Sequence, residues 1–413
     1  MRPQPVRFLS LAAATVATAA MLASCGSGGA DTQSKSPILI GASLSLTGGF
    51  SSDGLAFQRG YQLWQSDVNS HGGILGRQVK LVIVNDNSDP NKVVTNYKKL
   101  ITVDHVDLTF GPFSTLLTAP ASLAVHRYGY AMVEGAGGGG LVFQPKLNSV
   151  FDVSLPVASE LDPLVKWITS MPPGERPKTA AYPMGADDPF ADPPVQTAQK
   201  ALQAAGIRTV YSKTFTEKVS AYRAPAQQVA ATGAQIVVLG STDVPTVSTF
   251  MQAFEQQHYQ PQIFIATSGP DQGSAFLGSV GLANATGVMV PDGWYGAYSN
   301  PLSYVMVEEY IAKYGGTASD INADVAEAYS VGQVVDQAVT HNKSLSNAKL
   351  ISYLHSGVLL QSVQGPVKFT ALGQNLQPAA FVFQWQNGSF NQVLPSGAAG
   401  SAVILYPKPH WNS

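Results

Sequence analysis

Uninterrupted hydrophobic runs alternate with helical patterns in the first third of the chain. The first run, Ile38–Leu44, has no polar alternation, as expected of a parallel strand that is buried on both faces. A loop, 47–54, separates it from a stretch in which steps of three and four residues place hydrophobic positions on one helical face. These positions are Phe57, Gly60, Tyr61, Trp64 and Val68. The pattern predicts a strand, a loop and an amphipathic helix.

The same order of elements then repeats. His71-Gly72-Gly73 ends the helix, and a second strand is predicted at Val79–Val84. Asp89-Pro90 then starts another helix, because a carboxylate caps free amides and proline needs no N–H at the first helical position. Further strands are predicted at 106–110 and 130–134, with a helix between them that ends near Arg127. Four alternations predict a parallel sheet with ligand loops beyond its carboxyl ends, at 45–54, 85–90, 111–117 and 135–140.

A second run of the same kind begins near residue 156. Its predicted strands are Thr179–Tyr182, Ile207–Tyr211, Ile236–Leu239 and Ile263–Ala266. They alternate with helices at about 195–205, 222–231 and 245–257, and a loop is predicted at 183–194. A crossing strand at 288–295 and long helices at 302–314 and 323–341 follow. Asn387-Gly388 between alternating hydrophobic residues predicts a two-residue hairpin. The class is therefore α/β, with two Rossmann-like halves in series.

Composition narrows the function. Of 413 residues only 12% are charged, and the formal net charge is −2, so no basic surface exists to bind nucleic acid. The seven histidines lack metal-ligand spacing, and HExxH, GxSxG and Walker motifs are absent from the sequence. We therefore expect a protein that is not an enzyme and that holds no metal or cofactor. A catalytic constellation scattered through the sequence would escape such a search.

Three stretches carry a family resemblance: ILIGASLSLTGGFSSDG, VNSHGGILGRQVKLVIVNDNSDP and GPFSTLLTAPA. In this order they resemble the type I periplasmic solute-binding proteins, the branched-chain (leucine/isoleucine/valine) amino-acid binding group in particular, from about Pro37 to about Leu405. The resemblance implies two Rossmann-like domains that are joined by a three-strand hinge and close around a ligand. The implied domain I is 37–155 plus 291–363, and domain II is 156–290 plus 364–405.

The N-terminal segment predicts export. Arg2 and Arg7 precede an apolar run, 8–22, that is too short to cross a bilayer, so 1–24 is interpreted as a lipoprotein signal peptide. Cys25 is the only cysteine and follows Leu22-Ala23-Ser24, which matches the bacterial lipobox. We expect lipidation of Cys25, with 25–36 as a flexible tether, and the alternative is a free or buried thiol after an ordinary signal peptide.

Ser114 and Thr115 stand at a predicted helix N-terminus, where free amides and hydroxyls favour an anion. The resemblance assigns them to the ligand carboxylate, and ordinary helix capping is the alternative. Gly135–Gly140 fits GxGxxG, but the residues that follow are a poor helix opening, so the dinucleotide interpretation is weak. The resemblance instead assigns Gly137 and Gly138 to backbone contacts with the ligand, and a loop without a role stays open.

An amino-acid ligand also needs acceptors for its ammonium group. The family's acidic position aligns with Ser268 here, with Asp271 nearby, so α-amino-acid specificity is in question. Asp53 and Asp243 are the substitute candidates, although each has the alternative of a helix cap or turn residue. Phe190 falls near an aromatic position of the family.

The resemblance implies a substrate-binding lipoprotein of an ABC importer that is held outside the cytoplasm and hands a small polar solute to permease subunits as a monomer. A branched-chain or other amino acid is the expected solute, with amides, urea-like solutes and aromatic acids as alternatives. A sensory receptor of the same fold is the first competing function, and an α/β enzyme is the second. A DNA-binding repressor is disfavoured by the export signal.

Overall fold

The computed structural model describes residues 36–186, 189–216, 221–296, 300–376, 379–397 and 400–411. Its first sheet has five strands in the order β2-β1-β3-β4-β5, and all neighbouring strands are parallel. The strands are β1 (Ile38–Leu44), β2 (Val79–Asn85), β3 (Leu108–Phe110), β4 (Met132–Glu134) and β5 (Val150–Asp152). The α/β prediction is confirmed. The three-residue β5 was not predicted, because so short a run has no distinctive periodicity.

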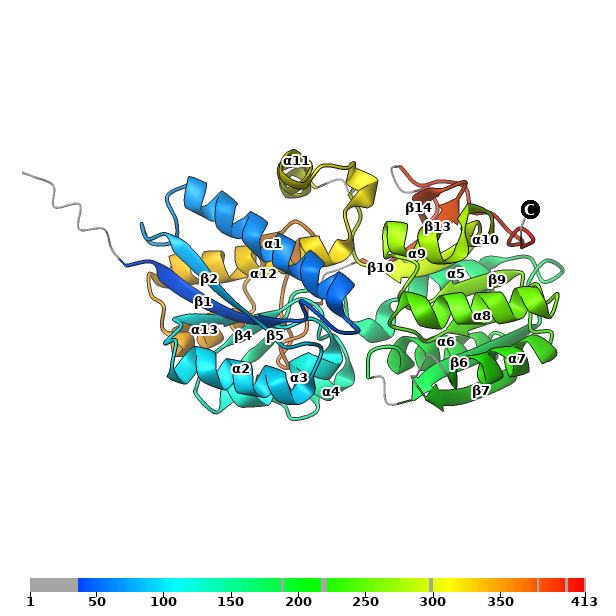
Figure 1. The fold of residues 1–413 in the computed structure, drawn as a ribbon, viewed down its shortest axis with the longest axis horizontal. Helices are drawn as coiled ribbons and strands as arrows, with labels where there is room; N and C mark the ends of the chain where they lie inside the picture. Colours follow the sequence, from blue (N-terminus) through cyan, green and yellow to red (C-terminus); the bar gives the residue numbers. More distant parts are fainter. Residues whose placement is uncertain are drawn as a thin grey trace, which may run out of the picture. The chain divides into compact units, whose positions relative to one another are not determined.

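Helices cover both faces of this sheet (Figure 1), as a parallel sheet requires. One core joins the sheet to α1 (Ser51–Ser70), α12 (Ala323–Asn342) and α13 (Asn347–Leu354). The opposite core joins it to α2 (Pro90–Thr102) and α3 (Thr115–His126). As predicted, α2 begins with Asp89 accepting hydrogen bonds from the amides of Asn91 and Lys92. The loop predicted at 47–54 is shorter in the structure, because α1 begins at Ser51 and its first turn includes residues 51–54.

The second sheet has seven strands in the order β14-β13-β10-β9-β8-β6-β7. Its strands are β6 (Thr179–Ala186), β7 (Arg208–Thr216), β8 (Ile236–Leu239), β9 (Ile263–Ala266), β10 (Val288–Asp292), β13 (Phe381–Gln386) and β14 (Ser389–Leu394). The pairs from β6 to β10 are parallel, whereas β13 runs antiparallel to β10 and to β14. The hairpin prediction is confirmed, because Asn387 and Gly388 join β13 to β14 with φ of 50° and 81°.

Helices also cover both faces of the second sheet. One core contains α5 (Asp162–Ser170) and α6 (Asp192–Ala204). The other contains α7 (Arg223–Ala231), α8 (Val244–Gln256) and α9 (Gly273–Val280). The remaining described elements are short connectors, apart from α11. They are α4 (Gly140–Phe143), α10 (Leu282–Ala285), α11 (Pro301–Tyr314), β11 (Leu360–Ser362), β12 (Gly365–Val367) and the 3₁₀ turns 157–159 and 318–320.

Strand β6 departs from the sequence prediction. It continues through Pro183 to Ala186, where a loop was predicted, and pairs with β7 along its whole length. Its ladder with β8 ends at Ala181, so the missing N–H of Pro183 interrupts no pairing on that side. The predicted loop is therefore wrong for 183–186, because proline is excluded only where both sides of a strand are paired.

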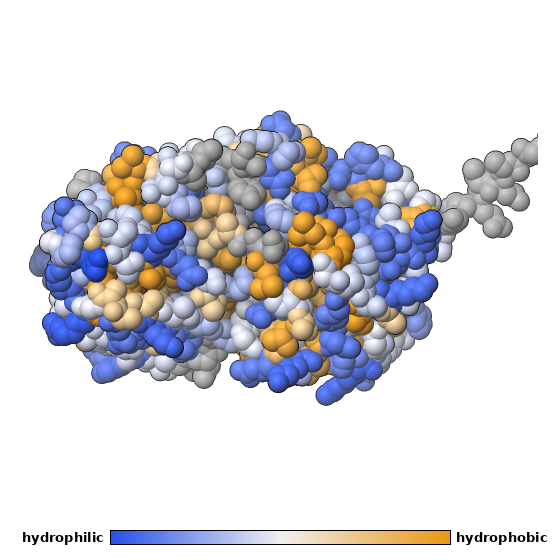
Figure 2. Space-filling model, turned by 180° about the vertical axis from the view of Figure 1, so that it is seen from behind, coloured by the Kyte–Doolittle hydropathy of each residue, from blue (hydrophilic) through white to orange (hydrophobic). Residues whose placement is uncertain are grey.

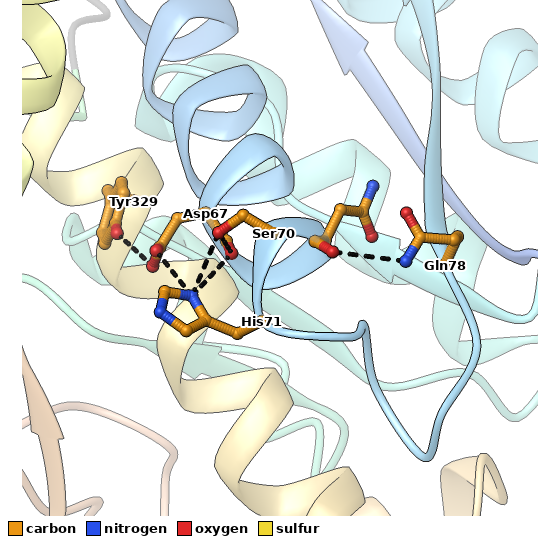
Figure 3. Close-up of polar contacts among 6 residues, drawn as sticks. Asp67, Ser70, His71, Gln78 and Tyr329 are labelled. Atoms are coloured by element: carbon orange, nitrogen blue, oxygen red, sulfur yellow. Dashed lines mark hydrogen bonds and ion pairs between the residues drawn. The ribbon is translucent and has the colours of Figure 1, made fainter.

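Helices α1 and α12 are held together at the C-terminal end of α1 (Figure 3). The hydroxyl of Tyr329 on α12 donates to Oδ2 of Asp67 on α1 at 2.7 Å. His71 Nδ1 lies 3.1 Å from Oδ1 of the same carboxylate. Further along the pair, Gly332 lies directly against the Trp64 ring. These contacts set the position of α12, whose N-terminal turn carries acidic residues.

Surface hydrophobic residues are dispersed. On the face shown in Figure 2, they form separate patches between hydrophilic residues. Within the described residues, no helix combines the length and the apolar character that a membrane crossing requires.

Candidate functional site

A cavity of about 120 Å³ lies where the loops of both sheets meet beyond the carboxyl ends of their strands. The first sheet contributes the loops after β1, β3, β4 and β5, and the second contributes the loops after β6, β8, β9 and β10. The first turns of α12 complete the wall. These are the positions from which a doubly wound sheet presents ligand contacts, so the cavity is the candidate binding site.

The N-terminus of α3 forms one wall of the cavity. Ser114 is its N-cap and accepts a hydrogen bond from Leu117 N at 3.3 Å. Thr115 is fully buried, and its hydroxyl accepts a hydrogen bond from Gly139 N at 3.1 Å. The first amides of a helix have no acceptor within the helix, and the helix dipole favours negative charge there. This wall therefore suits a carboxylate.

The glycine loop after β4 packs around a buried acid. Glu134 Oε2 accepts hydrogen bonds from Ala136 N at 3.0 Å and Gly137 N at 2.5 Å. A Cβ on Gly137 would lie 2.7 Å from Glu134 Oε1, so this glycine is needed for close packing. Gly138 instead lines the cavity. The helix that follows, α4, has four residues, which gives no N-terminal turn for a dinucleotide pyrophosphate.

Three carboxyl groups gather at the N-terminal ends of α1 and α12. Asp53 is 3% exposed and accepts from Gln272 Nε2 at 3.0 Å. Asp271, in the loop after β9, accepts from Gly269 N at 2.6 Å. Burial, followed by the charge of Asp271, raises the pKa of Asp53 well above its usual range. Burial, followed by the charge of Asp53, does the same to the pKa of Asp324.

Three more carboxyl groups line the cavity near β10. Asp292 accepts hydrogen bonds from Gly293 N at 2.6 Å and Trp294 N at 3.4 Å, and burial raises its pKa to about 8. Burial and then the charge of Asp292 raise the pKa values of Glu160 and Glu327 well above the usual range. Two such charges about 5 Å apart repel by roughly 3 kcal/mol at an effective dielectric constant of about 20. The cavity is therefore a region of strong negative potential whenever these groups are ionised.

No lysine, arginine or histidine lines this cavity among the described residues. The ion pairs found in the described part of the chain, His71–Asp67 and Lys99–Asp104, involve none of the lining carboxyls. Arg59 lines an adjoining hollow of about 450 Å³, where its Nη1 donates to the Tyr310 hydroxyl at 2.9 Å. The lining carboxyl groups thus have no cationic partner within the described cavity wall.

Hydrophobic side chains fill the rest of the wall. Phe50 and Phe113 stack edge to face with ring centroids 5.8 Å apart. The other apolar members of the lining are Leu116, Leu155, Val157, Pro189, Phe190 and Pro291. A lining that combines apolar side chains, a helix N-terminus and acidic groups suits a small solute that has polar ends and a hydrocarbon middle.

The structure brings most of the sequence-predicted site residues to this cavity. They are Asp53, Ser114, Thr115, Gly138, Phe190 and Ser268. Gly137 and Asp243 are not part of its lining. Asp243 is the N-cap of α8 and accepts from Thr246 N at 2.8 Å, which is the capping alternative that the sequence left open. Cys25 lies outside the described residues, and so do residues 187–188 of the predicted 183–194 loop.

Sequence analysis missed four of the six lining carboxyls. Asp292 falls in a stretch interpreted only as a crossing strand, and Asp324 and Glu327 in one interpreted only as a helix. Glu160 follows a short 3₁₀ turn that has no pattern of its own. One signal was available, because Asp324 and Glu327 share a helical face without a basic residue four positions on.

Comparison with known proteins places the chain in a family. The profile of the family described as "Periplasmic binding protein" matches residues 37–389. The Leu/Ile/Val-binding protein homolog 7 of Brucella melitensis is 23% identical over 402 residues, covering 94% of this chain and 98% of that protein. The Leu/Ile/Val-binding protein homolog 8 of Brucella abortus is 25% identical over 377 residues, covering 88% and 91%.

Solved structures share the fold. The branched-chain amino acid transporter substrate-binding protein LivJ of Streptococcus pneumoniae, in complex with isoleucine, superposes with a TM-score of 0.74 at 16% identity, covering 86% of this chain and 97% of that one. An ABC transporter solute-binding protein of R. palustris, in complex with benzoate, superposes with a TM-score of 0.72 at 16% identity, covering 90% and 99%. With the family profile spanning both sheets and the cavity between their loops, the chain belongs to the periplasmic binding protein family.

Proposed function

We propose that this protein is the extracytoplasmic substrate-binding component of an ABC importer and captures a small amino-bearing solute. The observation that carries the proposal is the cavity itself, which the loops of both sheets line beyond the carboxyl ends of their strands. The family membership supports it, since the profile covers residues 37–389. Permease subunits are the proposed partners, and a sensory receptor that uses the same cavity is the alternative.

One end of the solute carries a carboxylate in this proposal. The α3 N-terminus, the Thr115 hydroxyl and the Gly138 backbone are its proposed contacts, since all three line the same part of the fold. The solved relatives named above bind isoleucine and benzoate, and both of these molecules carry a carboxylate. Charge-assisted hydrogen bonds from amides and hydroxyls are the strong contacts available here.

The amino end of the solute faces acidic groups. Asp53, Asp271 and Asp324 are its proposed partners, and Ser268 holds Asp271 through a hydroxyl that donates at 3.3 Å. Phe190 contributes an apolar face. A dissociation constant near 1 μM corresponds to about 8 kcal/mol, which a few charge-assisted contacts in a largely dry cavity supply.

Capture proceeds by closure of two domains in this proposal. The domains in this proposal are those predicted from the sequence, 37–155 with 291–363 and 156–290 with 364–405. A solute that touches both sets of loops binds the closed form more tightly than the open form, so it shifts the population toward closure. The predicted lipid anchor at Cys25 and the tether 25–36 lie outside the described residues and stay predictions.

The carboxylate assignment is tested at Thr115. Replacing Thr115 by Ala removes a hydroxyl that lies on the cavity wall, so we expect affinity for a carboxylate-bearing ligand to fall about tenfold. Thr115→Ser keeps the hydroxyl, and its affinity should stay within about threefold of the parent. Isothermal titration calorimetry with the best ligand of a panel of amino acids, amides and aromatic acids measures both. Equal affinities in the two variants would remove Thr115 from the site.

A further inference from the structure

We infer that the captured solute carries two cationic groups, ammonium or guanidinium, joined by a short aliphatic chain. A diamine and a basic amino acid share this chemistry. The inference rests on the proposed function, because it concerns the same cavity, and it narrows the class of solute that the cavity takes.

The balance of charge is the first observation. Six carboxyl groups line the cavity: Asp53, Glu160, Asp271, Asp292, Asp324 and Glu327. Within the described part of the chain, no basic side chain lines the cavity with them. The ammonium group of a neutral amino acid adds one positive charge beside these carboxyl groups, and its own carboxylate adds a negative one. A solute with two cationic groups lets more of the carboxyl groups ionise without uncompensated charge in the cavity.

The second, independent observation is an unpaired carboxylate oxygen on Glu160. Its side chain is 8% exposed, lines the cavity and has no hydrogen-bond partner for Oε2 among the described residues. Buried polar atoms are nearly always paired, since an unpaired one forfeits its bonds to water. A hydrogen-bond donor on the bound solute pairs with this carboxylate oxygen. Gln364, whose amide atoms are also unpartnered, belongs to the same buried region but not to the cavity lining.

The carboxyl groups form two sets along the cavity. Asp53, Asp271 and Asp324 form the first set, at the N-terminal ends of α1 and α12 and after β9. Glu160, Asp292 and Glu327 form the second set. Asp271 is the largest charge effect on Asp53, and Asp292 is the largest on Glu160 and Glu327. The two sets adjoin each other, because Asp271 also acts on Asp292. One cationic group opposite each set is the arrangement that neutralises both.

The spread of the acids argues against a metal ion. Within the described ranges, no three His, Cys, Asp or Glu side chains converge closely enough to hold one. An extended organic cation reaches both sets, whereas an ion at one point reaches one of them. Phe113, Leu155 and Val157 also line the cavity and offer apolar surface to methylene groups. Aromatic faces also attract cations.

A calorimetric panel on the purified protein tests the inference. It compares leucine and isoleucine with lysine, ornithine and arginine, with putrescine and cadaverine, and with benzoate. We expect a dicationic compound to bind at least tenfold more tightly than leucine. Tightest binding by a basic amino acid shows that the carboxylate wall is also used, and tightest binding by a diamine shows that it is not. Leucine or isoleucine as the tightest ligand overturns this inference and leaves the proposed function standing, whereas benzoate as the tightest ligand, or no binding by any compound, overturns both.

A charge-neutral variant distinguishes binding in this cavity from non-specific electrostatic attraction of the ligand to the protein. Glu160→Gln keeps the size of the side chain, and we expect it to lower the affinity for the dicationic ligand at least tenfold, a larger factor than its effect on the affinity for leucine. Glu175→Gln makes the same chemical change at an exposed position and should leave both affinities unchanged. Thermal melting shows whether each variant is folded. An unchanged dication affinity in folded Glu160→Gln overturns the inference.

Discussion

Ser114 shows how a single residue shapes one wall of the cavity. Its backbone has φ 73° and ψ 148°, a conformation that residues with a Cβ rarely adopt. Its hydroxyl accepts from Leu117 N, so the strained residue is also the helix cap. Strain of this kind persists where the surrounding structure holds it and often marks a functional site. The sequence left helix capping open as the alternative to ligand binding, and the strain is visible only in the structure.

Asp53 and Asp243 illustrate two roles that the sequence did not separate. Both were candidates for the cation partner and both start a helix region, but only Asp53 lines the cavity. We predict that Asp243→Ala lowers the free energy of unfolding by about 0.5–2 kcal/mol, since it removes a helix cap, and changes ligand affinity less than about threefold.

Asp53→Asn is the counterpart variant. We expect it to lower the affinity for a cationic ligand about tenfold, while the free energy of unfolding stays unchanged. Chemical denaturation and calorimetry on both variants check the pair. A loss of affinity in Asp243→Ala as large as that in Asp53→Asn would return Asp243 to the site.

At the scale of elements, α12 links the core to the cavity. Its first two turns carry Asp324 and Glu327 to the lining, where the helix dipole lowers the cost of their negative charge. Its middle packs against α1, with Gly332 at the Trp64 ring. How closely α12 packs against α1 therefore sets the position of these two carboxyl groups in the cavity lining.

Gly332 and Gly278 form a matched pair for testing this packing. A Cβ on Gly332 would lie 2.1 Å from a Trp64 ring atom, so Gly332→Ala should destabilise the protein by about 1–3 kcal/mol. Gly278 lies within α9 with no atom near its added Cβ, so Gly278→Ala should be neutral or stabilise by up to about 1 kcal/mol. Denaturant titration measures both. Equal effects would show that α1 and α12 tolerate separation at this contact.

At the scale of the whole molecule, the ligand-free protein concentrates acidic groups from both sheets around one cavity. Burial raises the pKa of Asp292 to about 8 and that of Asp152, behind the cavity, to about 7. The charges that act on Asp292 include Asp271, and backbone donors from Gly293 and Trp294 oppose the shift. Glu134 and Asp152 are mutually close in the first sheet, and the charge of Asp152 raises the pKa of Glu134.

These shifts predict the pH dependence of stability. Each folded-state pKa lies above the unfolded value of about 4, so the folded state binds more protons between about pH 4 and pH 8. Unfolding free energy of the ligand-free protein should therefore fall as pH rises through this interval, by at most about 1.4 kcal/mol per pH unit for each group. Melting curves from pH 5 to pH 8.5 check this. A melting temperature that rises steadily across the interval would contradict it.

Much of the architecture was predictable because it is encoded locally. Hydrophobic runs such as Ile236–Leu239 and Ile263–Ala266 appear as strands with the predicted limits, and Asp89 caps α2 as its residue type suggested. The loop predicted from Pro183 onward was wrong, because a strand accepts proline where the side that lacks the N–H is unpaired, and only the paired strands show which side that is. Local pattern determines element type, whereas pairing decides where an element ends.

The sequence by itself determined the alternation of strands and helices, the parallel α/β class, the Asn387-Gly388 hairpin and the helix that begins after Ser114, because each depends on neighbouring residues. The tertiary structure alone decided that Asp53, Glu160, Asp292 and Glu327 share one cavity. These residues lie in different helices, strands and turns, and only the packing of α12 and the convergence of strand ends bring them together. The fold was thus a property of local periodicity, whereas the charge of the site arose from contacts between distant segments.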